Sequence, residues 1–147
     1  MIRVHGTAVA LGGDGVLLRG PSGSGKSDLA LRLIAEGARL VSDDQTELRR
    51  LGDQVRMSAP ATIVGQIEIR GVGIVKLPAI PSARLTLVVD LVPRDAIERM
   101  PEPQTCTLLD LEFPRISLTP FEASATAKLR FALPLLAGAA LRQAEGS

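Results

Sequence analysis

A glycine-rich stretch of eight residues constrains the fold of this chain more than any other feature. It has the pattern G-x-x-x-x-G-K-S and consists of Gly20, Pro21, Ser22, Gly23, Ser24, Gly25, Lys26 and Ser27. An apolar run, residues 16–18, precedes it, and residues 28–36 follow it with helical spacing. This context is typical of a phosphate-binding loop, because glycines let successive backbone N–H groups face an anion at a helix N-terminus. In such a loop Lys26 reaches the outer phosphates and Ser27 holds Mg2+, so we expect a P-loop domain of the α/β class.

The composition limits the classes of function. The chain has 147 residues, enough for one domain with its own core. Seventeen basic residues nearly balance sixteen acidic ones, so no nucleic-acid or membrane partner is indicated. The longest apolar run, residues 131–141, is shorter than the ~20 residues of a membrane span. The single cysteine, Cys106, excludes an intramolecular disulfide, and we interpret it as a small buried apolar residue of a cytoplasmic protein.

The other sequence patterns predict a mixed sheet and few helices. Residues 2–11 and 16–18 flank a Gly-Gly-Asp-Gly cluster, which predicts a hairpin that leads into the glycine-rich loop. A second hairpin is expected on the sheet edge at residues 46–57. Further strands are expected at residues 85–92, 107–111 and 115–118, and a C-terminal helix at residues 121–143, kinked or interrupted at Pro134 and Gly138.

Two sets of carboxylates are candidates for the acidic residue that acts beside the nucleotide and its metal ion. A short strand, residues 39–42, ends in Asp43 and Asp44, and a strand that leaves the loop's helix usually lies beside the strand that entered it. These two side chains would therefore emerge near the loop, although neighbours on a strand face opposite ways unless the strand has already ended. The alternative is Asp90, at the end of an apolar strand, as the metal acid of a generic NTPase.

A second glycine-containing stretch carries charged residues. Glu68 and Arg70 stand directly before Gly71 and Gly73. Two glycines so close together indicate backbone that bends sharply or approaches a ligand. The alternative is an ordinary strand-to-turn transition with a solvated Glu and Arg, which the spacing alone favours.

Four stretches follow the order found in the catalytic domain of bacterial HPr kinase/phosphorylase, which this chain resembles. They are His5-Gly6, the loop of residues 20–27, R-L-V-S-D-D at residues 39–44, and E-I-R-G-V-G-I at residues 68–74. The resemblance is clear over residues 4–75 and weaker afterwards. Members of that family phosphorylate a serine of the phosphocarrier protein HPr and can remove this phosphate with inorganic phosphate. The resemblance implies a fold like the nucleotide domain of phosphoenolpyruvate carboxykinase, with a hairpin that feeds the phosphate loop.

The resemblance implies roles for the residues around the phosphates. Lys26 would bind the phosphates and stabilise the transferring group. Ser27 and Glu68 would hold Mg2+. Asp44 would be the base for the acceptor serine, with Asp43 as the next candidate; a carboxylate suffices because phosphoryl transfer depends on positioning and charge compensation.

The resemblance also places residues at the rim of the site. His5 would lie near the phosphates, where it would hydrogen-bond phosphate or tune the aspartate. Arg70 would belong to the catalytic surface. The later catalytic arginine of the family is placed at Arg99, with Arg94 as the alternative, and Asp90 would be a residue of a core strand.

The departures from the family pattern decide which expectations stay open. The chain begins where the family's catalytic domain begins, so we expect one stand-alone P-loop kinase domain, residues 1–147, without the amino-terminal domain of longer members. Residues 118–124 differ from the family stretch associated with dephosphorylation. We expect an ATP- and Mg2+-dependent protein-serine kinase acting on an HPr-like phosphocarrier, with phosphorolysis and a homo-oligomer left open. The alternatives are a small-molecule kinase or NTPase that uses Asp90, and a nucleotide-gated regulatory module without turnover.

Overall fold

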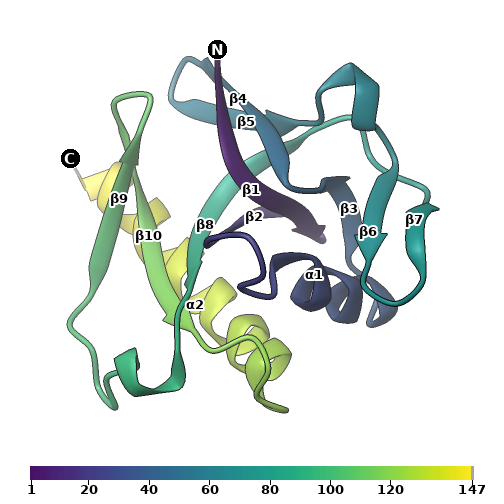
Figure 1. The fold of residues 1–147 in the computed structure, drawn as a ribbon. Coiled ribbons are helices and arrows are strands. Elements are labelled where there is room, and N and C mark those ends of the chain that lie inside the picture. Colours follow the sequence, from purple (N-terminus) through teal and green to yellow (C-terminus); the bar gives the residue numbers. More distant parts are fainter. Residues whose placement is uncertain (147) are drawn as a thin grey trace.

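A mixed β-sheet and two helices form the fold of this computed structural model, which describes residues 1–146 (Figure 1). The strands are β1 (Ile2–Leu11), β2 (Asp14–Arg19), β3 (Arg39–Ser42), β4 (Gln45–Leu51), β5 (Gln54–Ser58), β6 (Gln66–Ile69), β7 (Gly73–Lys76), β8 (Ala83–Leu91), β9 (Gln104–Leu108) and β10 (Leu111–Leu118). The helices are α1 (Lys26–Ala35) and α2 (Ala125–Gly146), with short 3-10 turns at Ala61–Ile63 and Arg94–Ala96. Parallel pairs β2–β8 and β8–β10 stand among antiparallel ones, which confirms an α/β fold with a mixed sheet.

The predicted hairpin leads into the glycine-rich loop. Strands β1 and β2 pair antiparallel across a turn in which Gly12 has a φ of 62°, a left-handed conformation that favours glycine. The chain then passes through the loop into α1, which begins at Lys26 and so starts two residues earlier than expected. Gly37, with a φ of 110°, follows the end of this helix, as its sequence position predicted.

The second hairpin, β4–β5, does not lie on a sheet edge as expected. Strand β4 pairs with both β1 and β5, and β5 also pairs with β8. Because β8 pairs with β2, the strands β1, β4, β5, β8 and β2 close into a ring. Closure removes the exposed edges that an open sheet would present.

Three further expectations need correction. Strand β3 pairs with β1, not with the strand β2 that enters the loop. The last strands form one hairpin, β9–β10, which turns at Leu109 and Asp110 with φ of 51° and 64°. The apolar run at residues 107–111, expected to be one strand, therefore contains this turn. Helix α2 passes Pro134 and Gly138 without a break. Pro134 is exposed, so water can satisfy the backbone carbonyl that lacks the proline N–H.

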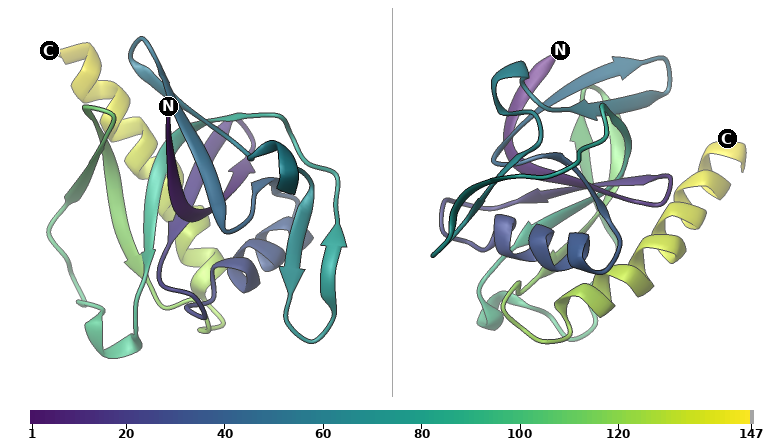
Figure 2. Two further views of the ribbon diagram at one scale, coloured as in Figure 1. Left: turned by 45° about the horizontal axis from the view of Figure 1, so that its top comes forward. Right: turned by 90° about the vertical axis from the view of Figure 1, so that its right-hand side faces the viewer.

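The core lies on both faces of the strands. Ala8 and Ala10 face the inside of the ring with Leu17 and Met57, and all are buried. Val9, between them, faces the helices, because successive side chains on a strand point to opposite faces. Both helices lie on the same side of the sheet, where they cover this second cluster (Figure 2). Cys106 is half-buried beside the ring cluster, less enclosed than predicted.

A separate two-stranded sheet, β6–β7, lies beside α1 (Figure 1). Its turn contains Gly71, with a φ of 87°, and ends at Gly73, the first residue of β7, with a φ of 122°. The backbone bends sharply here, as predicted, within a strand-to-turn transition that leaves Glu68 and Arg70 exposed, as the alternative had it. Over the part of the chain that the structure describes, neither helix combines the length and apolar character needed to cross a membrane.

Candidate active site

The side chain of Lys26 is folded back into the glycine-rich loop. Its ammonium donates hydrogen bonds to the carbonyl oxygens of Gly20 at 2.7 Å and Pro21 at 3.0 Å. The residue is 6 % exposed. Burial lowers the pKa of Lys26, while the nearby carboxylates of Asp44 and Asp43 act in the opposite direction. The loop therefore holds a desolvated cation against its own carbonyl oxygens, at the start of α1.

Gly25 is required at its position for two reasons. Its φ is 101°, in the left-handed region that other residues rarely adopt. A Cβ at this position would also lie 2.9 Å from Phe121 Cζ and 2.9 Å from Pro120 Cγ. Phe121 and Pro120 therefore rest directly on the loop, and any side chain at Gly25 would displace them.

Asp43 connects three parts of the site. Its Oδ1 accepts hydrogen bonds from the hydroxyls of Thr7 at 3.0 Å and Ser27 at 2.7 Å. Its Oδ2 accepts one from the backbone N–H of Glu68 at 3.0 Å. With Asp43 only 6 % exposed, these contacts join β1, α1 and β6 through one buried carboxylate.

Asp44 stands at the mouth of the site and pairs with His5. Its Oδ1 lies 2.7 Å from Nε2 of His5, and the two side chains are 60 % and 41 % exposed. Strand β3 has already ended at Ser42, and Asp44 has a φ of 67°. Since the backbone is no longer extended, Asp43 and Asp44 line the same pocket instead of facing opposite ways.

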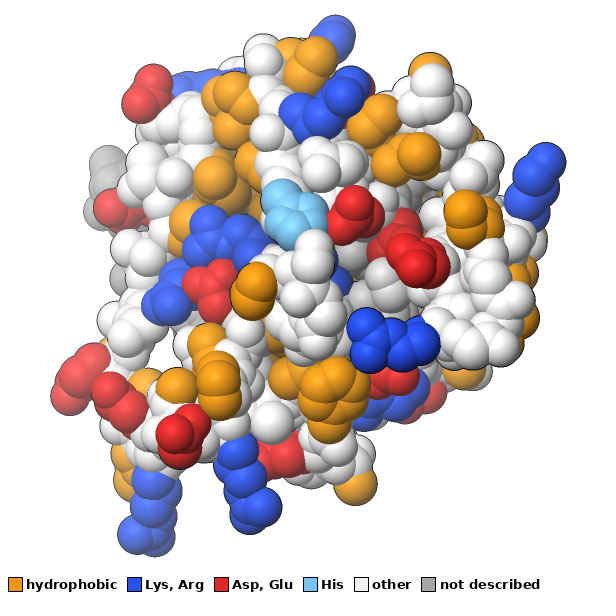
Figure 3. Space-filling model, viewed as in Figure 1, with side chains coloured by type: hydrophobic (Ala, Val, Ile, Leu, Met, Phe, Trp, Pro, Cys, Tyr) orange, Lys and Arg blue, Asp and Glu red, His pale blue; other side chains and the backbone are white. Residues whose placement is uncertain are grey.

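A pocket of about 410 Å³ brings most of the predicted residues together. It is lined by Ser22, Gly23, Gly25, Lys26, Ser27, Asp43, Asp44, Glu68 and Arg70. The guanidinium of Arg70 approaches the loop, 4.0 Å from where a Cβ on Gly23 would lie. Figure 3 shows the one histidine at the centre of this face with acidic side chains beside it. The pocket thus places a buried cation and accessible carboxylates around one space.

The rest of the loop supports this arrangement without lining the pocket. Gly20 and Pro21 supply the carbonyl oxygens that bind Lys26. The backbone N–H of Ser24 donates to the carbonyl of Pro21 at 3.0 Å, which closes a turn. The Ser24 hydroxyl is buried without a hydrogen-bond partner in the described structure.

The two candidate arginines of the later loop are not brought into this pocket. Arg99 is exposed and is not among the residues that line it. Arg94 is 87 % exposed and forms an ion pair with Glu122, with 3.7 Å between Arg94 Nε and Glu122 Oε1. The single chain therefore places neither arginine at the pocket.

Asp90, the alternative acid, lies in an ion cluster outside the pocket. Arg19 donates to both of its carboxylate oxygens at 2.8 and 3.0 Å, and Arg115 also binds it. Burial acts to raise the pKa of Asp90, but the hydrogen bonds from Arg19 and Arg115 outweigh it and lower that pKa. Asp90 holds the adjacent strands β2, β8 and β10 together, and both of its oxygens are occupied.

Several residues of the site escaped the sequence analysis. Thr7 binds Asp43 and accepts a hydrogen bond from the backbone N–H of Asp44 at 3.1 Å. Thr7 follows His5 by two residues and so lies on the same face of β1, and this spacing could have indicated that Thr7 belongs to the site. The pocket lining that was not predicted consists of Asp28, Leu31, Ile69 and Phe121.

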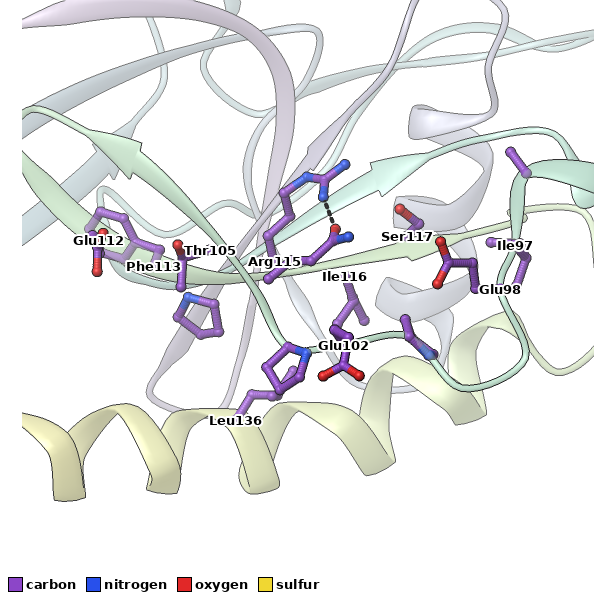
Figure 4. Close-up of a pocket in the computed structure, with 15 residues that line it drawn as sticks. Ile97, Glu98, Glu102, Thr105, Glu112, Phe113, Arg115, Ile116, Ser117 and Leu136 are labelled. Atoms are coloured by element: carbon purple, nitrogen blue, oxygen red, sulfur yellow. Dashed lines mark hydrogen bonds between the residues drawn. The ribbon is translucent and has the colours of Figure 1, made fainter.

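A larger cavity, of about 610 Å³, lies between the β9–β10 hairpin, the preceding loop and α2 (Figure 4). Ile116, Phe113 and Leu136 contribute apolar surface to it, and Arg115 binds Gln104 at its wall. None of the predicted site residues lines it. Size alone therefore does not locate the chemistry of this chain.

The pocket offers few protein ligands for a metal. No group of three or more His, Cys, Asp and Glu side chains is gathered as a metal site within the described residues. The Ser27 hydroxyl and the Glu68 carboxylate do line one pocket. One or two protein oxygens are what a Mg2+ ion needs when substrate phosphates and water complete its shell. The residues present therefore fit Mg2+ better than a metal bound by protein alone.

Comparison with known proteins gives consistent matches. Residues 1–128 match the family described as HPr Serine kinase C-terminal domain. The HPr kinase/phosphorylase of Geobacillus thermodenitrificans is 39% identical over an alignment of 127 residues, and the match covers 78% of this chain and 41% of that protein. That of an Exiguobacterium species is 38% identical over an alignment of 130 residues, and the match covers 80% of this chain and 42% of the relative. The chain thus spans about two-fifths of the length of these relatives.

A solved structure matches nearly the whole chain. The structure of the Hpr(Ser) kinase/phosphatase from Coxiella burnetii superimposes with a TM-score of 0.79 at 25% sequence identity. The match covers 99% of this chain and 94% of that chain. The fold, including its later part where the sequence resemblance is weaker, is therefore shared.

Proposed function

Because the chain belongs to the family of the HPr Serine kinase C-terminal domain, we propose that it is an ATP- and Mg2+-dependent protein-serine kinase that acts on an HPr-like phosphocarrier protein. The observation that carries this proposal is the pairing of a buried Lys26 in the loop with an exposed Asp44 at the mouth of the same pocket. A small-molecule kinase can enclose its acceptor, whereas an exposed base can receive a serine from the surface of another protein.

The loop residues would hold the nucleotide. Lys26 would exchange its bonds to the loop carbonyls for bonds to the outer phosphates of ATP. Ser27 and Glu68 would supply oxygens to Mg2+, which offsets phosphate charge when bound. Arg70, beside the loop at Gly23, would neutralise charge that develops on the transferring group.

Asp44 would act as the base, with His5 orienting it. The acceptor serine oxygen attacks the γ-phosphorus, the bond to the ADP oxygen breaks, and the serine proton passes to Asp44. The 2.7 Å contact with Nε2 of His5 restricts the carboxylate to one side of the pocket mouth. In phosphorolysis the protonated Asp44 would return this proton to the serine oxygen while inorganic phosphate takes the phosphoryl group as pyrophosphate. Asp43, whose oxygens are already engaged by three donors, would position Ser27.

The remaining features of the proposal follow the same resemblance. We place the chain in the cytoplasm as one P-loop domain with a nucleotide site like that of phosphoenolpyruvate carboxykinase, where a hairpin feeds the phosphate loop. A homo-oligomer would allow Arg99 to act at the pocket of a neighbouring copy, since its own chain leaves it outside.

Transfer of γ-labelled phosphate from ATP, with Mg2+, to a purified HPr-type carrier from the same organism tests the proposal. We expect label on a carrier serine, loss of labelling in Asp44→Asn, and normal labelling in Asp53→Asn, an exposed aspartate in the β4–β5 turn. ATP bound or hydrolysed without label would favour a regulatory module or another substrate. An Asp90→Asn variant that loses more activity than Asp44→Asn would favour the NTPase alternative.

A further inference from the structure

Three arginines stand side by side on the outer face of the strand ring. Arg49 on β4 is the direct cross-strand partner of Arg56 on β5, and Arg56 is the direct partner of Arg84 on β8. Directly paired residues point to the same face of a sheet. With about 4.8 Å between neighbouring strands, the three guanidinium groups form a row roughly 10 Å long. We call Arg49, Arg56 and Arg84 the arginine row.

The row faces water because the alternate positions of these strands fill the core. Leu48, Val55 and Met57 are fully buried inside the ring. The intervening positions must therefore point outward. Arg49 and Arg84 are exposed, and the half-buried Arg56 donates a hydrogen bond to the Ser82 hydroxyl at 2.7 Å.

The charge of the arginine row is not compensated. Where the structure describes side chains, no carboxylate lies within salt-bridge distance of any of the three. Glu47, on the same face of β4, is already paired with Arg3 at 3.0 Å. Like charges directly opposite each other destabilise a sheet. Folding alone therefore gives no reason to place three arginines in register.

The arginine row lies on the same outer face as the base of the candidate active site. His5 is the cross-strand partner of Gln45, and Arg49 follows Gln45 by four residues on β4. At about 3.4 Å per residue, the row begins roughly 13 Å from His5 along the strand. A globular domain of about 100 residues has a radius of gyration near 13 Å. A protein whose serine reaches Asp44 is therefore large enough to cover the row as well.

We propose that the arginine row is a docking surface for an acidic patch on the protein substrate, outside the catalytic pocket. This inference rests on the proposed protein-kinase function. Guanidinium groups match carboxylates in a two-pronged geometry, and a row across three strands fits several carboxylates better than one small anion in a concave pocket. Exposed charges of this kind speed association with a complementary partner and leave the chemical step unchanged.

The test compares the unaltered protein with a variant carrying Arg49→Gln, Arg56→Gln and Arg84→Gln, using the HPr-type carrier as substrate. We expect the KM for the carrier to rise roughly three- to thirty-fold, while kcat and the KM for ATP stay the same. Rising salt should increase the carrier KM of the unaltered protein and have less effect on the variant. The control, Arg39→Gln on β3, removes an exposed arginine outside the row and should change neither the KM for the carrier nor its dependence on salt.

Thermal unfolding separates docking from a structural role. Removing like-charge repulsion should leave the melting temperature of the triple variant unchanged or higher, whereas a row needed for folding would lower it. A labelled carrier with the same KM and salt dependence in both proteins overturns the docking surface alone. A carrier that the unaltered protein does not label overturns the proposed function, and the docking surface with it.

Discussion

The buried carboxylate of Asp43 offers a prediction whose size follows from its contacts. In Asp43→Asn one oxygen remains and the other becomes an NH2 group, while the shape of the side chain is kept. Three donors converge on Asp43: two hydroxyls on Oδ1 and the backbone N–H of Glu68 on Oδ2. The two hydroxyls can rotate and accept hydrogen bonds from an NH2 group, whereas the backbone N–H of Glu68 can only donate. The remaining oxygen is therefore expected to face Glu68, and the new NH2 group to face the hydroxyls of Thr7 and Ser27.

The expected destabilisation is roughly 2 kcal/mol. Exchanging a hydrogen bond to a charged group for a neutral one costs about 0.5–1 kcal/mol for each of the three contacts, with Thr7, Ser27 and Glu68. For a domain of this length, such a change lowers the melting temperature by about 4–8 °C.

The assay is urea and thermal unfolding followed by far-UV circular dichroism, since the chain contains no Trp or Tyr for fluorescence. The matched control is Asp44→Asn, whose side chain is 60 % exposed and should cost less than about 1 kcal/mol. Asparagine also tolerates the positive φ of Asp44, so the control adds no backbone strain. Equal unfolding free energies for the two variants, or a loss below about 1 kcal/mol for Asp43→Asn, would refute this account of Asp43.

Three further predictions concern the stability of the glycine-rich loop and of the strands beside it. The pKa of Asp90 is lowered in the folded state, so the stability that its carboxylate contributes is present above about pH 4 and is lost as the pH falls through that lowered pKa. Urea melts over a pH series should show this loss in the unaltered protein but not in Asp90→Asn. At pH 7 the free energy of unfolding of Asp90→Asn should be lower by about 2–3 kcal/mol. Gly37→Ala should lose about 1–3 kcal/mol of stability through backbone strain alone. Gly25→Ala should lose more than Gly37→Ala, because a Cβ at Gly25 also meets Phe121, and equal losses in thermal unfolding would argue against that contact. Ser24→Ala removes a buried hydroxyl that has no partner and should leave stability unchanged or raise it by up to about 1 kcal/mol, so a clear loss in thermal unfolding would contradict the burial seen here.

The sequence predicted the parts of the fold that depend on local chemistry. The glycine-rich loop, the hairpin before it and the bends at Gly71 and Gly73 follow from backbone conformations that few other residues adopt. The pairing of strands was predicted poorly. Whether β3 lies beside β1 or β2, and whether β4–β5 is an edge or part of a ring, depends on contacts between distant segments that no local pattern encodes.

In the candidate site too, some residues could be predicted from local sequence and others could not. Lys26 and Ser27 could be predicted from a phosphate-loop motif that carries its own geometry, whereas Glu68, which lines the same pocket, was indicated only by the family resemblance. Asp44 was ranked before Asp43 only through the family resemblance, because the left-handed backbone of Asp44 is a non-glycine exception that the residue pattern itself does not signal. Burial then distinguishes them: one carboxylate is saturated by donors, and the other is open to a partner.

Strand β1 explains why these separate segments meet. It pairs with β4 through residues 2–5, and with β2 and β3 through residues further on, so it changes partners at Gly6. A Cβ on Gly6 would lie 2.9 Å from Leu17 Cδ1 and 3.0 Å from the Leu18 carbonyl oxygen. The N–H of Gly6 also donates to the carbonyl of Asp44 at 2.8 Å. A glycine is therefore needed directly after His5. Without a Cβ, the backbone of β1 can approach β2 closely at this position while it also binds Asp44 and holds it beside the histidine.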